Sequence, residues 1–182
     1  MFGRSSGQTR FGREKPWRRH LRTTREGKVF IFVTLGVGLA AFNTGNNLIF
    51  LVFGFMLSLI VLSGILSELA IRGVSVTRRP PERAFVGSTC LVELALQNRK
   101  RRVPSYSLEV EDVVEGFTTE RRCYFLKVAA GLKQVAGYRR TPHKRGVLRF
   151  CGFRISTRYP FGIFEKWRNL YAPGEMLVYP SI

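Results

Sequence analysis

The sequence has few of the residues that perform most acid–base and metal chemistry. Its 182 residues include two His, three Cys and a single Asp, Asp112. One Asp is too few for a calcium loop or a paired-aspartate magnesium site, and so few His and Cys leave little material for a zinc cage. CxxC and HExxH motifs and a glycine-rich phosphate loop are also missing. We therefore expect no enzymatic activity and no bound metal or cofactor.

One pairing could resemble a thiol hydrolase, namely Cys123 or Cys151 with His143. His143 lies in the basic turn Thr-Pro-His-Lys-Arg-Gly, and no oxyanion loop accompanies it. We interpret the three cysteines, Cys90 included, as core-facing residues of strands. Their odd number cannot pair completely within the chain, which suits a reducing compartment.

Acidic residues gather only at Glu109, Glu111, Asp112 and Glu115. On a strand, Glu109 and Glu111 share a face, where two carboxylates could hold a divalent ion. We favour the alternative that they form the solvent face of an edge strand, where charge limits aggregation.

Charge is absent from Val29 to Ser67, a run of 39 positions. A membrane helix needs about 20 apolar residues, so the run fits two helices, at about 28–43 and 47–67, joined by a polar turn. A signal peptide would have only one short apolar run. The sequence therefore predicts an N-terminal transmembrane α-helical hairpin over 29–67. Gly54 and Ser58 form a small-xxx-small step, which we expect to pack the two helices together; oligomerisation is the alternative.

Basic residues flank this hairpin on both sides. Residues 1–28 hold nine Lys or Arg against two Glu, which predicts a basic cytoplasmic arm. Four arginines lie between residues 72 and 83, and the turn between the helices is uncharged. By the positive-inside rule, the sequence predicts a multi-pass protein with both termini cytoplasmic.

The remaining residues, 73–182, change to a pattern of short alternating segments separated by turn residues. Seven to nine such segments, about ten residues apart, are typical of an all-β antiparallel sandwich of the Ig-like kind. A closed barrel is the alternative. We therefore assign 73–182 to a β-sandwich domain.

This domain is strongly basic, and its charge comes in runs at strand ends. The longest run is Arg99, Lys100, Arg101 and Arg102. Because a bilayer would lie nearby, we expect these residues to contact anionic lipid headgroups, in preference to nucleic acid. An acidic protein partner is a third possibility.

A second possible contact site surrounds Pro160-Phe161-Gly162, which matches a type I turn. Phe161, Phe164 and Trp167 recur every three residues and could cap the end of the sandwich. If they are exposed, they form an apolar patch suited to a partner.

Two segments carry a family resemblance, LAAFNTGNNLIFLVFGFMLSLIVLSGILSE and RGVLRFCGFRISTRYPFGIFEKW. They resemble the front half of bacterial membrane proteins of the "domain of unknown function 58" family, over residues 29–180. The resemblance implies two helices in the bacterial cytoplasmic (inner) membrane followed by a β-rich segment. Members are often encoded beside MoxR-type AAA+ ATPases, so it also implies such an ATPase as a partner. The family-defining downstream motif does not appear before Ile182, so any active module of the family is missing from this chain.

These observations predict an integral inner-membrane protein that presents a cytoplasmic β-sandwich as an interaction or scaffolding module. The alternatives are a basic module that binds the membrane surface or nucleic acid, and the non-catalytic front half of a larger membrane protein.

Overall fold

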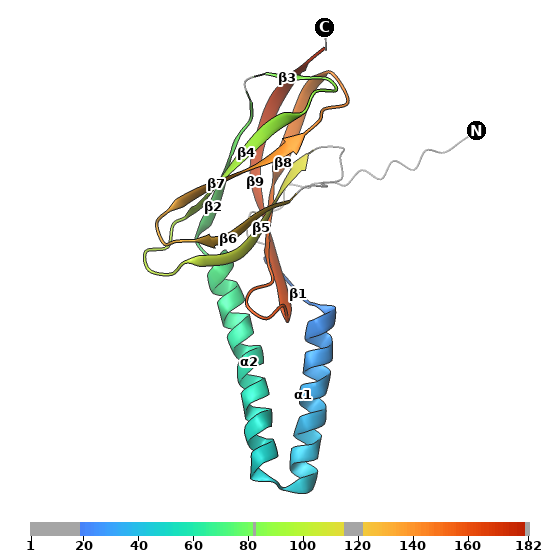
Figure 1. The fold of residues 1–182 in the computed structure, drawn as a ribbon, viewed down its shortest axis with the longest axis vertical. Helices are drawn as coiled ribbons and strands as arrows, with labels where there is room; N and C mark the ends of the chain where they lie inside the picture. The colour runs from blue at the N-terminus through green and yellow to red at the C-terminus, as the bar shows by residue number, and fades with distance from the viewer. Residues whose placement is uncertain (1–18, 82, 115–121, 181–182) are drawn as a thin grey trace, which may run out of the picture.

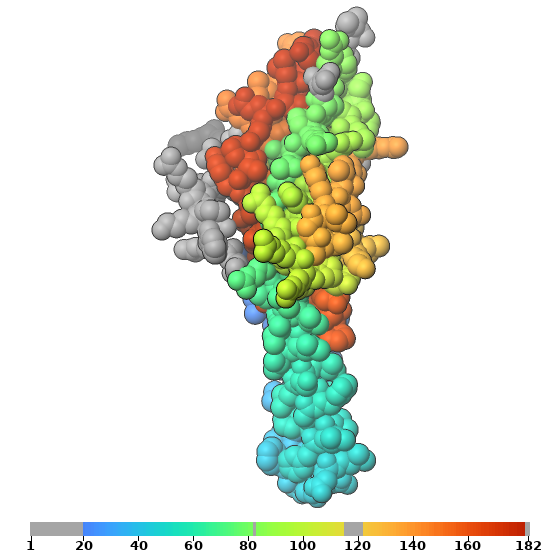
Figure 2. Space-filling view, turned by 90° about the vertical axis from the view of Figure 1, so that its left-hand side faces the viewer, coloured from blue at the N-terminus to red at the C-terminus, as the bar shows by residue number. Residues whose placement is uncertain are grey.

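The computed structural model describes residues 19–81, 83–114 and 122–180, and its elements stand in two parts. Two helices form a narrow column at one end of a β-sandwich (Figures 1 and 2). The predicted order of two helices followed by antiparallel strands is confirmed. The predictions for residues 1–18 and for Glu115 lie outside the described residues. The elements are β1 (Arg19–Thr23), α1 (Arg25–Thr44), α2 (Asn47–Ile71), β2 (Val74–Arg79), β3 (Ala84–Phe85), β4 (Cys90–Asn98), β5 (Ser105–Val114), β6 (Arg122–Val128), β7 (Lys133–Arg140), β8 (Gly146–Thr157) and β9 (Phe164–Tyr179).

Local capping explains where the helices begin and end. The Thr24 side chain accepts the Gly27 N–H over 2.9 Å, so α1 begins within the expected basic arm and before residue 28. Gly45 closes α1 in the left-handed conformation, with φ 62°, where glycine has no steric penalty. Asn46 caps α2 by accepting the Leu48 N–H. The connection is therefore shorter than the predicted turn, and α2 continues past Ser67 to Ile71.

Most of the apolar surface of the helices faces outward. Both helices are long and apolar enough to cross a membrane, and 22% and 6% of their most apolar stretches are buried within the protein. The helices touch where Gly38 meets the ring of Phe53. A side chain at Gly54 would meet nothing within 4 Å, and Ser58 is exposed. The expected packing role of the Gly54–Ser58 step is therefore wrong, because that face of α2 points away from α1.

Two separate sheets make the second part a sandwich and not a barrel. In the described residues, one sheet has six strands in the order β1-β9-β8-β5-β6, with β3 also paired to β9. The other has three strands in the order β2-β4-β7. Every pairing is antiparallel except β3 with β9.

The core lies between the sheets, because alternate residues of each strand point inward. Ile71, at the end of α2, belongs to this core and so joins the helices to the sandwich. A second buried cluster lies at the end far from the helices. The largest buried apolar side chains of the main core are Phe125, Phe153, Leu94, Leu96, Leu108 and Ile155.

Strand order corrects two expectations. Residues 19–23 belong to the expected basic arm, yet they form β1 at the edge of the larger sheet. β5 lies between β8 and β6, so Glu109 and Glu111 are not on an edge strand. An interior antiparallel strand with one solvated face has the same alternating pattern as an edge strand, and the sequence could not separate them.

Candidate membrane-facing site

Three segments of the sandwich meet the ends of the two helices. They are β1, the turn between β4 and β5, and the turn between β8 and β9 (Figure 1). All three lie at the end of the sandwich from which α1 and α2 project. This end contains every residue predicted from the sequence to contact lipid or a partner.

The basic turn after β4 is held against the end of α2. The Arg99 N–H donates to the Gly73 carbonyl over 2.8 Å. Asn98 braces the turn from within: its side-chain amide donates to the carbonyls of Val103 and Val128 over 3.0 and 3.1 Å. Its side-chain oxygen accepts the Lys100 N–H. The turn is therefore an ordered part of the helix–sandwich junction.

Its four basic side chains divide into two kinds. Arg99, Arg101 and Arg102 are exposed. Lys100 is partly buried, and its ammonium donates to the Leu69 carbonyl in the last turn of α2. Burial lowers the pKa of Lys100 below its usual value. Since cations stabilise the C-terminal ends of helices, Lys100 caps α2, and only the three arginines are available to a ligand.

The turn between β8 and β9 lies against the start of α1. The hydroxyl of Thr24 donates to the Gly162 carbonyl, and the Thr24 N–H donates to the Ile163 carbonyl over 3.2 Å. A Cβ at Gly27 would lie 2.1 Å from that Ile163 oxygen, so only glycine allows this approach. In this turn the Tyr159–Pro160 peptide bond is cis, and the Gly162 N–H donates to the Arg158 carbonyl over 2.8 Å.

The three predicted aromatic residues do not form one patch. Phe161 is 52% exposed at the tip of this turn, whereas Phe164 and Trp167 are partly buried. Trp167 stacks on His20 of β1, with ring centroids 5.2 Å apart. Trp167 therefore holds β1 in place, and only Phe161 of the three is free to meet a lipid or a partner.

An ion pair links β9 to α2 at the same level. The ammonium of Lys166 lies 3.3 Å from a carboxylate oxygen of Glu68 and donates to the Gly64 carbonyl over 3.0 Å. Together with Lys100 and Thr24, this contact fixes the sandwich to both helices. The sequence showed the charges but could not show which strand end meets which helix.

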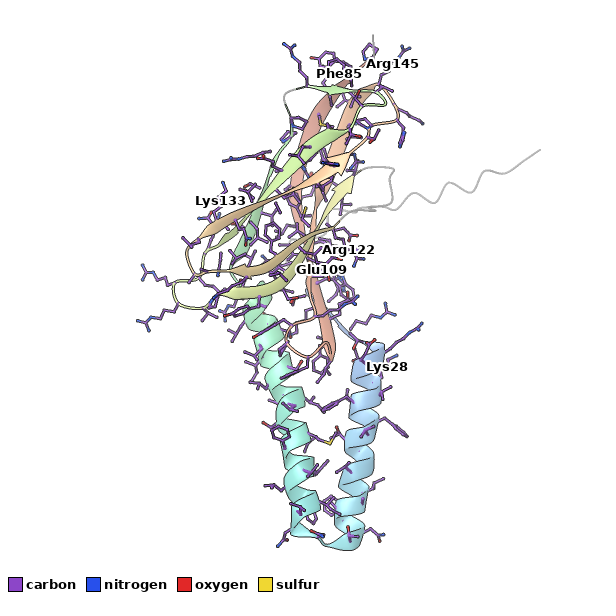
Figure 3. The ribbon with its side chains drawn as sticks, in the orientation of Figure 1. Lys28, Phe85, Glu109, Arg122, Lys133 and Arg145 are labelled. Atoms are coloured by element: carbon purple, nitrogen blue, oxygen red, sulfur yellow. The ribbon has the colours of Figure 1, made fainter. Side chains whose placement is uncertain are left out.

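The two described glutamates of the acidic cluster, Glu109 and Glu111, pair with arginines. Arg122 lies 3.1 Å from Glu109 and 3.5 Å from Glu111, and Arg154 lies 3.9 Å from Glu111 (Glu109 and Arg122 are labelled in Figure 3). In the described residues, no group of three His, Cys, Asp or Glu side chains could hold a metal ion. Asp112 points into the core, where Arg78 and Tyr138 bind it.

Two of the cysteines, Cys90 and Cys123, sit in environments that suppress thiolate formation. Burial raises the pKa of Cys123, and the nearby negative charge of Asp112 adds to the effect. Burial also raises the pKa of Cys90. None of the three cysteines is in a disulfide. His143 is exposed in its turn, as expected.

Comparisons with protein-family models and with curated proteins find no match. Among solved structures, the chain is similar to a CARDB domain from Pyrococcus furiosus, determined by solution NMR (13% identity, TM-score 0.40) and as a crystal structure with di-metal ions (14% identity, TM-score 0.43). Each match covers 59% of this chain and 94% of the other. The sporulation control protein Spo0M from Bacillus subtilis matches at 10% identity and TM-score 0.35, covering 60% of this chain and 50% of that one.

Proposed function

We propose that the chain is an integral membrane protein that mounts a basic β-sandwich on the cytoplasmic face of a bacterial inner membrane, as an interaction module. One observation carries the proposal: separate segments of the sandwich are fixed to the same end of two apolar helices, and only 22% and 6% of the most apolar stretches of these helices are buried within the protein. Such a junction would hold the domain in one orientation relative to the bilayer.

The exposed surface of the helices supports insertion. Phe32, Leu39, Phe42, Leu51 and Phe55 are among the exposed large side chains along both helices. Leaving such side chains in water costs about 1.5–3 kcal/mol each relative to full burial. A bilayer removes this cost, and each helix satisfies its own backbone groups as the hydrocarbon core requires.

The charges at the junction support the cytoplasmic side. Arg72, Arg99, Arg101 and Arg102 are all exposed near the end of α2, and Arg25 and Lys28 are exposed at the start of α1. Basic residues in such positions favour the cytoplasmic face. There they would meet anionic headgroups, with about 1 kcal/mol gained for each residue near the surface.

Cysteine labelling tests insertion and orientation together. Two single-cysteine variants would be made in a background lacking Cys90, Cys123 and Cys151. One is Asn43→Cys, at the end of α1 beside the connection to α2, and the other is Lys133→Cys, on the sandwich. Both would be probed with a membrane-impermeant maleimide. We expect Asn43→Cys to react in intact cells and Lys133→Cys to react only after lysis. The opposite pattern places the sandwich outside, and release of the chain by alkaline carbonate contradicts insertion.

A further inference from the structure

Four apolar side chains gather on the outer face of the larger sheet, at the end farthest from the helices. Phe85, Val147, Leu177 and Tyr179 are 39%, 53%, 50% and 41% exposed. We call this group the distal patch. Figure 3 labels Phe85 at this end of the molecule, opposite the helices.

Sheet register makes the distal patch continuous. Val147 of β8 lies directly opposite Leu177 of β9. Tyr179 follows two residues along β9 and so shares the face of Leu177. Phe85 of β3 pairs with Tyr179, and their ring centroids are 6.0 Å apart. Three strands therefore contribute to one surface.

The fold does not need these side chains for its core. On the inner face of the same strands, Ala84, Phe150, Met176 and Val178 are at most 4% exposed and form the second buried cluster. The outward positions of a half-solvated sheet are usually polar. Four adjacent apolar side chains there are typical of a contact surface.

Positive charge surrounds the distal patch. Arg83 directly precedes β3, Lys144 and Arg145 directly precede β8, and all three are exposed. Arg149 of β8 lies beside the patch and pairs over 3.4 Å with Glu175 of β9. Among the described residues of these two strands, Glu175 is the one acidic residue next to the patch. The rim is therefore strongly basic, and Figure 3 labels Arg145 at the same end of the molecule as Phe85.

We propose that the distal patch binds an acidic segment of a partner protein, with apolar side chains on the patch and carboxylates on the rim. An apolar centre with a polar rim is the usual anatomy of a protein interface, and the basic charges of this rim select an acidic partner. Val147 and Leu177 are aliphatic and favour apolar side chains of a peptide over nucleic-acid bases, which would have only the rings of Phe85 and Tyr179 to stack on. This inference deepens the proposed function by naming the binding face, which points away from the membrane.

A peptide of defined composition tests the proposal on the full chain in detergent. The probe is a short fluorescent peptide of alternating Glu and Leu or Phe. One control replaces each Glu by Lys, and another replaces each apolar residue by Ser. We expect fluorescence anisotropy to show binding of the first peptide at physiological salt and at least about tenfold weaker binding of both controls. Equal binding of all three peptides, or none, contradicts the proposal.

Matched variants locate the binding. Leu177→Ser and the pair Lys144→Gln with Arg145→Gln should each weaken binding at least about fivefold, and the pair should also reduce its salt dependence. The control is Leu126→Ser on β6, which is 81% exposed and lies outside the patch. Equal loss in this control overturns the assignment, as does tighter binding of a single-stranded oligonucleotide. Because the protein is in detergent, the result is independent of the topology experiment.

Discussion

Arg78 of β2 and Asp112 of β5 form a two-point ion pair that joins the two sheets inside the sandwich. The Arg78 Nε donates to one carboxylate oxygen over 2.8 Å, and Nη2 bonds to the other. The side chains are 7% and 1% exposed. The hydroxyl of Tyr138 on β7 donates to the same carboxylate over 2.8 Å, and the guanidinium lies 3.9 Å from the ring centroid of Phe150. These contacts fix how the sheets align.

Removing the carboxylate should destabilise the sandwich strongly. Asp112→Ala leaves the buried Arg78 charge and the Tyr138 hydroxyl without their acceptor, and we expect a loss of about 3–5 kcal/mol in the free energy of unfolding. Denaturant unfolding in detergent, followed by near-UV circular dichroism, measures it. Arg149→Ala, which breaks an exposed pair with Glu175, should cost about 1 kcal/mol or less. Equal losses would show that the buried pair has no special role.

Tyr138 should give stability a specific alkaline dependence. Burial, and then the negative charge of Asp112, raise the pKa of Tyr138 above its ordinary 10.0. The pKa of Tyr138 is higher in the folded state than in the unfolded state. The stability that the protonated Tyr138 contributes is therefore fully present below the unfolded pKa and is lost as pH rises through the folded pKa. We expect the unfolding free energy to fall more steeply above about pH 10 in the native protein than in Tyr138→Phe. Parallel curves for the two proteins contradict this prediction.

The sequence allowed the broad architecture to be predicted because the two parts have different apolar patterns. The uncharged run from Val29 to Ser67 has the length and composition of two apolar helices, and this pattern is local to the run. The alternation after residue 73 reports one buried face for each strand. Both signals are local, and both are confirmed as helices and strands.

The junction and the buried pair could not be predicted because each depends on residues far apart in the chain. Lys100 looks like its neighbours Arg99 and Arg101 until α2 is placed beside it. Asp112 looks like part of an acidic surface cluster, although its position is in step with the buried residues Val110 and Val114. This inward position in the alternation, taken by the only Asp of the chain, was the one feature of the sequence that could have placed Asp112 in the core. β1 was missed because its pairing with β9 compensates for a weak local pattern.

Gly27 should be far less tolerant than Gly36 on the same helix. An added Cβ at Gly27 meets the Ile163 backbone, whereas one at Gly36 meets nothing within 4 Å. We expect Gly27→Ala to destabilise the protein by about 1–3 kcal/mol, as overpacking does, and Gly36→Ala to be neutral or slightly stabilising. Thermal unfolding of the two variants in the same detergent compares them. A neutral Gly27→Ala would show that the β8–β9 turn is not held against α1.

Lipid binding and structural support should be carried by different side chains of the basic turn. Changing Arg99, Arg101 and Arg102 together to Gln should lower retention of an anionic phospholipid at least about tenfold, because each contributes about 1 kcal/mol near a charged surface. Native mass spectrometry from mixed micelles measures retention, and the thermal midpoint should stay unchanged because these side chains are solvated.

Lys100→Gln should have the opposite effect to the triple arginine variant, with a loss of stability and little loss of lipid. Its ammonium binds the Leu69 carbonyl at the end of α2, so its loss should lower the thermal midpoint and leave lipid retention largely intact. Retention in the native protein should also fall as salt is raised, because exposed charges are screened. If the triple variant keeps its lipid, or if Lys100→Gln loses lipid without losing stability, the division of the turn into contacting arginines and a capping lysine is wrong.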